Sequence, residues 1–100
     1  MEYLEIEIIE YTDDAFPGWV KCKFIDIAGK THYIYEKVPV VSLENINSNT
    51  LFPIKGSIRG KIIDKNNDSV CFSSLEPDNI STSDGEDTFF VSEKQIHKIM

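Results

Sequence analysis

The sequence predicts an all-β fold: a small antiparallel barrel or barrel-like sandwich of six to seven strands with a short C-terminal helix. Short apolar-rich segments are separated by turn signals at intervals of roughly 8–12 residues, which is typical of sandwiches and barrels. Residues 19–38 have the pattern of a long β-hairpin with apolar residues on both faces, and this favours a barrel over a flat sheet. No linker or internal repeat divides the chain, so we expect a single domain over residues 1–100.

The first strand is expected over residues 3–11, where apolar residues alternate with glutamates. Ile9 interrupts the alternation, which indicates either a β-bulge or an outer face that is also covered. Pro17 and Gly18 suit the centre of a type II turn, where glycine supplies the positive φ. Antiparallel pairing across this turn predicts an apolar inner face, an ion pair and an aromatic pair: Ile8 opposite Cys22, Ile6 opposite Phe24, Glu7 opposite Lys23, and Tyr11 beside Trp19.

The hairpin over residues 19–38 turns near Ala28-Gly29. A two-residue loop would place Lys21 opposite Glu36 and Phe24 opposite Tyr33, whereas a three-residue loop would shift every pair by one. The first arm is expected to point Val20, Cys22 and Phe24 inward. In the second arm two tyrosines share one face and His32, Ile34 and Glu36 the other, and the pattern leaves open which face is the core.

The second half of the chain predicts further strands. Pro39 ends the hairpin or marks a sheet edge, and Ser42 could cap one helical turn. Strands are expected over 58–63, 70–72, 79–82 (weakly) and 87–91, with turns over 64–69 and 83–86. Gly60 at mid-strand suits a tight bend or a close backbone approach. Ser92 and Gln95 have the spacing of a capping box, which predicts a short helix over 95–99 packed through Ile96 and Ile99.

The net charge of −7 is unevenly distributed along the chain. Residues 1–18 carry only acidic charges, residues 19–65 are net basic, and residues 66–100 are net acidic again. Because phosphate binding depends on clustered Lys and Arg, the overall sign argues against nucleic acid. An acidic patch would instead attract a basic protein, although turn chemistry and solubility also explain its candidate members: Asp13, Asp14, Asp84, Glu86 and Asp87.

A basic stripe is the alternative binding feature. It would form if two strands that point their cations outward lay side by side, with Trp19, Tyr33 or Tyr35 as stacking platforms for bases. Neutralisation by Glu5, Glu7 and Glu36 across the strands is the simpler interpretation. The candidate members of the stripe are Lys21, Lys23, Arg59 and Lys61.

No catalytic, metal or cofactor site is predicted. The acidic and amide residues at 64–68 begin like a calcium loop, but Ser69 and Leu75 stand where that loop needs glycine and a bidentate acid. His32 is expected on a strand surface, and neither it nor His97 has a nucleophile at a suitable spacing. Cys22 and Cys71 alternate with apolar neighbours, so we expect buried free thiols.

The chain is expected to be cytoplasmic and to make no contact with membranes. No apolar run approaches the ~18 residues of a membrane span, and the N-terminus lacks the basic start and apolar segment of a signal peptide. We expect a monomer or a weak homodimer.

Three segments resemble a family of small uncharacterised bacterial proteins: 16–20 (Phe-Pro-Gly-Trp-Val), 36–41 (Glu-Lys-Val-Pro-Val-Val) and the Gly56-x-Ile58-x-Gly60 region. The likeness covers residues 2–95. It implies a compact β-barrel similar to the barrel domains of translation elongation factors, and it implies no catalytic residue because the family has no assigned activity.

These observations favour a non-enzymatic protein-interaction module, such as an immunity or inhibitor protein that binds a basic partner. The alternative is a nucleic-acid- or ribosome-associated barrel that uses the basic middle of the chain. A small hydrolase or a ligand pocket inside the barrel is the third hypothesis, and the sequence offers least for it.

Overall fold

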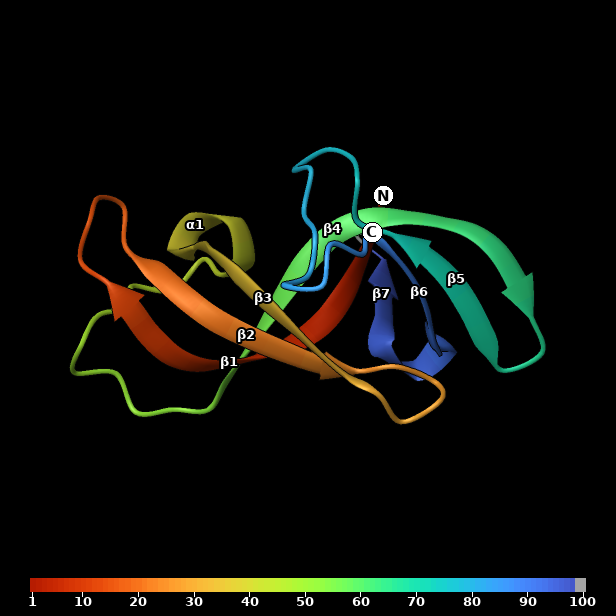
Figure 1. Ribbon diagram of the computed structural model, residues 1–100, viewed down its shortest axis with the longest axis horizontal. Helices are drawn as coiled ribbons and strands as arrows, with labels where there is room; N and C mark the ends of the chain where they lie inside the picture. Colours follow the sequence, from red (N-terminus) through yellow and green to blue (C-terminus); the bar gives the residue numbers. More distant parts are fainter. Residues whose placement is uncertain (99–100) are drawn as a thin grey trace.

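The computed structural model describes residues 1–98, which form one curled antiparallel sheet (Figure 1). The helical segments are short: α1 (Val38–Val41) and a 3-10 turn, η1 (Glu93–Gln95). The strand order is β3-β2-β1-β4-β5-β6, with β7 also beside β1, which confirms the predicted all-β, barrel-like fold. The strands are β1 (Glu2–Asp13), β2 (Trp19–Ile25), β3 (Thr31–Lys37), β4 (Ile54–Asn66), β5 (Ser69–Ser73), β6 (Thr88–Ser92) and β7 (Ile96–Lys98).

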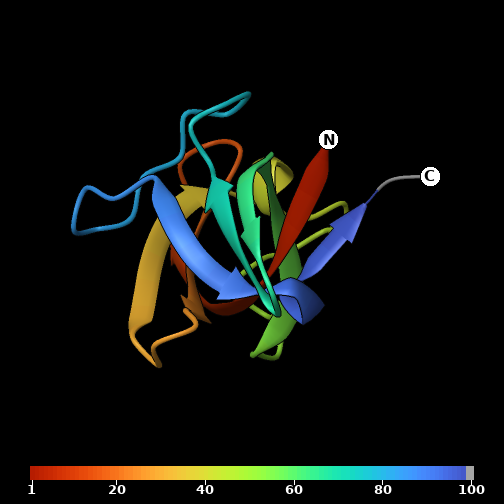
Figure 2. The ribbon, with the colours of Figure 1, turned by 90° about the vertical axis from the view of Figure 1, so that its right-hand side faces the viewer.

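Strand β1 is the centre of the sheet. One of its edges pairs with β4 from Glu2 to Ile8, and its other edge pairs first with β7 and then with β2. The two ends of the sheet curve toward each other, so that β3 lies near β6 (Figure 2). Two backbone hydrogen bonds link these ends: Ile27 N donates to Phe90 O at 2.8 Å, and Ser83 N donates to Tyr33 O at 2.9 Å.

The predicted register between β1 and β2 is confirmed for two pairs: Glu7 lies opposite Lys23, and Ile8 lies opposite Cys22. Of the two explanations for Ile9, the β-bulge is the one observed, because the register shifts between Ile8 and Glu10. That shift places Tyr11 opposite Val20, so the predicted pairing of Tyr11 with Trp19 is wrong.

The turn between these strands lies one residue earlier than predicted. Gly18 N donates to Ala15 O at 2.7 Å, so Phe16 and Pro17 are its central residues. Gly18 follows them with a φ of +95°, and the expected need for glycine is therefore met at the end of the turn.

The hairpin of β2 and β3 adopts the register shifted by one, with Lys21 opposite Tyr35 and Phe24 opposite His32. His32 and Ile34 therefore face the core, while Tyr33 and Tyr35 are exposed. The prediction that His32 lies on the surface is wrong: only 4% of it is exposed. Both faces of β3 carry apolar or aromatic residues, so alternation alone does not show which face is buried. Packing against β6 determines that the face with His32 and Ile34 is buried.

Strand β4 is longer than predicted and contains the expected close approach at Gly60. A Cβ atom there would lie 2.2 Å from the Ser73 carbonyl oxygen and 2.4 Å from Phe72 Cζ. Before this strand, α1 buries Val38 and Val41, and Ser42 is its C-terminal cap rather than the N-cap of a following turn.

Two expectations for the last third of the chain are corrected. Residues 79–82 form no strand, because Ile80 exchanges hydrogen bonds with Ser74 inside the loop. The capping box of Ser92 and Gln95 is confirmed, but its helical segment ends after one turn and residues 96–98 pair with β1 as β7. Ile99, the last residue of the expected helix, lies outside the described residues.

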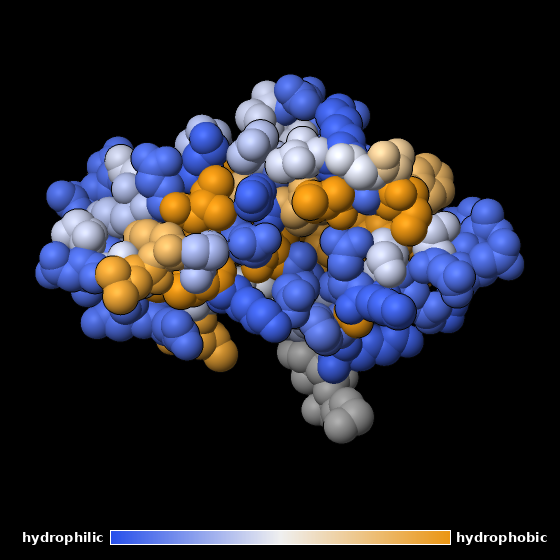
Figure 3. All heavy atoms as spheres, turned by 90° about the horizontal axis from the view of Figure 1, so that it is seen from below, coloured by the Kyte–Doolittle hydropathy of each residue, from blue (hydrophilic) through white to orange (hydrophobic). Residues whose placement is uncertain are grey.

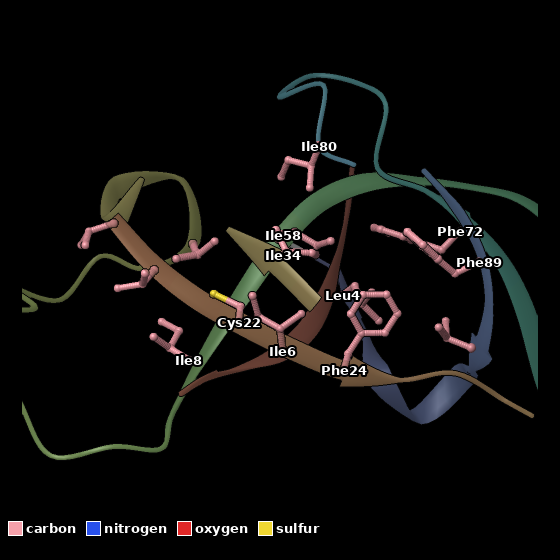
Figure 4. Packing of buried hydrophobic residues seen from close by; sticks show 14 of the residues in the cluster. Leu4, Ile6, Ile8, Cys22, Phe24, Ile34, Ile58, Phe72, Ile80 and Phe89 are labelled. Carbon is pink, nitrogen blue, oxygen red and sulfur yellow. The ribbon is translucent and has the colours of Figure 1, made fainter. Parts of the chain in front are cut away.

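The core contains residues from each of the strands β1 to β6 (Figure 4). Leu4, Ile6 and Ile8 of β1 are at most 2% exposed. Phe72 and Phe89 from the β5–β6 end pack into the same cluster as Phe24 from β2. The predicted burial of both free cysteines is confirmed.

Candidate functional site

Three of the five predicted acidic residues come together in the loop between β5 and β6. Thr82 organises the turn: its N–H donates to Glu86 O at 2.8 Å, and its hydroxyl accepts from Glu86 N at 3.1 Å. Gly85, with a φ of +82°, closes the turn onto Thr82 O. Asp84 and Glu86 are consequently exposed on either side of Gly85, and Asp87 follows as the loop enters β6.

The other two predicted acids lie elsewhere. Asp13 ends β1, and Asp14 is in the turn before Trp19. The loop that carries Asp84 contacts the opposite end of the β2–β3 hairpin, since Lys30 Nζ lies 3.7 Å from Asp84 and 3.8 Å from Glu86. A seven-residue strand spans about 20 Å, so the five acids do not form one patch.

Exposed apolar side chains lie next to the acidic loop. Ile27 and Phe90 are joined through their backbones, and about half of each is exposed, as is half of Ile25. From below, orange apolar side chains gather in two areas of an otherwise hydrophilic face (Figure 3). We use the name apolar–acidic surface for Ile27, Phe90, Asp84, Glu86 and Asp87.

Sequence patterns predict only the acidic half of this surface. A signal for the apolar half was present, because Ile25 and Ile27 change phase relative to the inward residues of β2. Phe90 likewise alternates with the inward Phe89 and Val91. Their proximity depends on the curling of the sheet, which brings β6 to the end of the β2–β3 hairpin.

A buried histidine lies beneath this surface. His32 Nε2 donates to Asp26 Oδ2 at 2.8 Å, and Asp26 Oδ1 accepts from the N–H groups of Ala28 and Lys30. Burial pushes the pKa of Asp26 upward, but these hydrogen bonds outweigh it and lower the pKa below its ordinary value. Asp26 therefore stays ionised at neutral pH and holds the hairpin loop together.

The thiols offer no activated nucleophile near the surface. Burial raises the pKa of Cys22 to about 12, with a smaller contribution from Glu36. Burial also raises the pKa of Cys71, assisted by Asp64. Both thiols are therefore protonated at neutral pH, and the thiolate is the reactive form.

The candidate basic stripe is divided in the structure, because β1 lies between β2 and β4. Lys21 lies over the rings of Tyr33 and Tyr35 at 4.8 and 5.7 Å, and Lys23 lies opposite Glu7. On β4, Arg59 is held by Asp78, at 2.6 Å and 3.0 Å, and Lys61 lies 3.5 Å from Glu76. The four cations therefore form two separate pairs, each with acidic or aromatic neighbours.

A hollow lies away from the apolar–acidic surface. It encloses about 610 Å³ between α1 and the strands β1, β4 and β7, and its lining includes Tyr3, Val40, Leu43, Arg59 and His97. Arg59 is already paired with Asp78, and His97 Nε2 lies 3.3 Å from Glu5. Over residues 1–98, no group of three or more His, Cys, Asp or Glu side chains is arranged to hold a metal ion.

No helix in the described part of the chain is both long and apolar enough to cross a membrane. Comparisons with known protein families, with curated proteins and with solved structures give no match. The resemblance to a small bacterial family and to elongation-factor barrels therefore stays a prediction.

Proposed function

We propose that this protein is a non-enzymatic interaction module that binds a basic protein partner, in the manner of an immunity or inhibitor protein. The observation that supports this proposal most is the apolar–acidic surface. A backbone hydrogen bond joins the exposed residues Ile27 and Phe90. The acidic 81–87 loop leads into the strand that carries Phe90 and contacts Lys30 in the loop that carries Ile27. Protein interfaces commonly combine an apolar centre with a charged or polar rim.

The charge of the chain suits a basic partner. A net charge of −7 attracts cationic proteins over long range and accelerates their encounter. The apolar centre would then supply most of the short-range affinity, since buried aromatic side chains are frequent hot spots. Asp84 and Glu86 would exchange their exposed contacts with Lys30 for contacts with Lys or Arg of the partner, and such exposed ion pairs cost little to break.

Affinity capture from the native source, followed by mass spectrometry, tests this proposal. We expect the immobilised wild-type protein to enrich one or a few basic proteins, and the best of these to bind in solution at low salt. Phe90→Ser should weaken that binding by about thirtyfold, the loss that corresponds to a hot-spot residue. The double variant Asp84→Lys, Asp87→Lys should weaken it further and reduce the salt dependence.

The matched control is Asp13→Lys, Asp14→Lys, which changes the net charge by the same amount at the opposite end of β2. We expect this control to retain most of the affinity. Equal losses in the two double variants would contradict a localised surface and leave only a general charge effect. Unchanged binding in Phe90→Ser would remove the apolar centre from the proposal. Retention on heparin at low salt would support the nucleic-acid alternative instead.

A further inference from the structure

His32 brings an ionisable ring into the apolar core. Its ring stacks on Phe24 with centroids 5.0 Å apart and meets Phe89 edge-on at 5.2 Å. The side chain is 3% exposed. Its two ring nitrogens are therefore the polar groups in this pocket that require partners, because a buried polar atom without one is costly.

Each nitrogen faces a carboxylate from a different loop. Nε2 lies 2.8 Å from Asp26 Oδ2, which begins the loop between β2 and β3. Nδ1 lies 3.3 Å from Glu86 Oε2, in the acidic loop, but it makes no hydrogen bond there. Lys30 lies beyond Glu86 and also contacts Asp84. Among the described residues, Asp26 and Glu86 are the charged side chains paired with the ring, and Lys30 and Asp84 form the ion pairs next to it.

The chemistry of the ring makes the Glu86 contact depend on protonation. Asp26 is ionised and can only accept, so Nε2 carries the proton that it donates. In the neutral ring Nδ1 is then a bare acceptor that faces another acceptor, the Glu86 carboxylate, and this contact is repulsive. When Nδ1 takes up a proton it becomes a donor, and a charge-assisted hydrogen bond to Glu86 can form.

From this arrangement we infer that His32 is a pH-sensitive clasp between the two loops of the apolar–acidic surface. The protonated ring holds Glu86 and ties the 81–87 loop to the β2–β3 hairpin, whereas the neutral ring releases it. The consequence for binding rests on the proposed function. A released Glu86 is available to cations of a basic partner, so binding should be tighter at pH 8 than at pH 5.

Nitrogen-15 relaxation of the 81–87 loop tests the clasp at pH 5 and pH 8 without any partner. In the wild type we expect backbone order parameters of Asp84 to Glu86 to fall from about 0.85, the value of rigid backbone, toward about 0.6 at pH 8. Glu86→Gln should abolish this change, because its amide can donate to neutral Nδ1 and accept from protonated Nδ1. Asp84→Asn is the matched control: it alters the other Lys30 contact, and its loop should respond to pH as the wild type does.

The clasp is overturned if the wild-type loop does not change between the two pH values, or if Glu86→Gln changes as much as the wild type. Loss of the response in Asp84→Asn would also overturn it and assign the effect to Lys30. Failure of the proposed function gives a different result: the loop responds to pH as described, but captured proteins bind independently of the apolar–acidic surface.

Discussion

At the scale of single residues, Gly60 shows how closely two strands approach in this fold. Gly60 lies in the interior of β4, and the space that its Cβ would occupy is filled from β5. One of the obstructing atoms is the backbone oxygen of Ser73, which cannot move without displacing the strand. Two more belong to the ring of Phe72, which is fully buried and cannot rotate away freely.

We therefore predict that Gly60→Ala lowers the free energy of unfolding by about 3 kcal/mol, at the upper end of the usual cost of overpacking. Gly29→Ala is the control, because a Cβ at Gly29 meets nothing within 4 Å and only its φ of +86° opposes the change. That variant should lose about 1–2 kcal/mol. Urea denaturation of the three proteins measures both losses. Equal losses in the two variants would show that the Gly60 contact relaxes easily.

At the scale of elements, the side chain of Gln95 holds the C-terminal segment through hydrogen bonds to two other residues. Gln95 Oε1 accepts from Ser92 N at 2.9 Å and completes the capping box of η1. Its Nε2 donates to the carbonyl oxygen of Ile25, the last residue of β2, at 3.0 Å. Gln95 thus connects the residue before β7 to the end of β2. These two strands pair with successive parts of the same edge of β1.

Gln95→Ala should lower the free energy of unfolding by about 1–2 kcal/mol, since it removes a cap and leaves two backbone groups without their partners. Local effects should exceed this global one: the amides of β7 should exchange with solvent faster than those of β4. Lys94→Ala is the control in the same turn, because the cap accepts from its backbone N–H and not from its side chain. Hydrogen exchange that is equally fast in both variants would show that Gln95 does not hold β7.

At the scale of the whole molecule, sequence patterns predicted contacts between strands that are adjacent in sequence. They missed contacts that form only because the sheet curls and brings distant strands together. The Glu7–Lys23 and Ile8–Cys22 pairs follow from neighbouring strands joined by a short turn, so alternation alone determined them. Strand β7 pairs with residues more than ninety positions away, and its capping box pointed to a helix instead. The candidate site divides in the same way.

Asp84, Glu86 and Asp87 were grouped correctly because they are adjacent in sequence. Ile27 and Phe90 become neighbours only when the sheet curls. The burial of His32 also depends on β6, whose Phe89 covers its ring. Hydrophobic alternation records which residues point to one side of a strand, but it does not record which distant strand covers that side.

Closure of the sheet predicts cooperative unfolding. Strands β2 and β5, which carry Trp19 and Cys71, are not neighbours in the strand order, but both contribute residues to one core cluster. Trp fluorescence and thiol accessibility should therefore report the same urea midpoint. Phe89→Ala should lower the free energy of unfolding by about 3–5 kcal/mol and shift both midpoints together, because Phe89 packs against Phe24 with ring centroids 4.9 Å apart.

Phe90→Ala is the matched control for this variant. It removes the same ring one position along β6, from a side chain that is 55% exposed, and should change stability by no more than about 0.5 kcal/mol. If the Cys71 thiol became accessible before the Trp19 signal changed, β5 and β6 would unfold as a separate unit. The contact of Phe89 with Phe24 would then be too weak to couple the two ends, and the apolar–acidic surface, which spans them, would be lost before the rest of the fold.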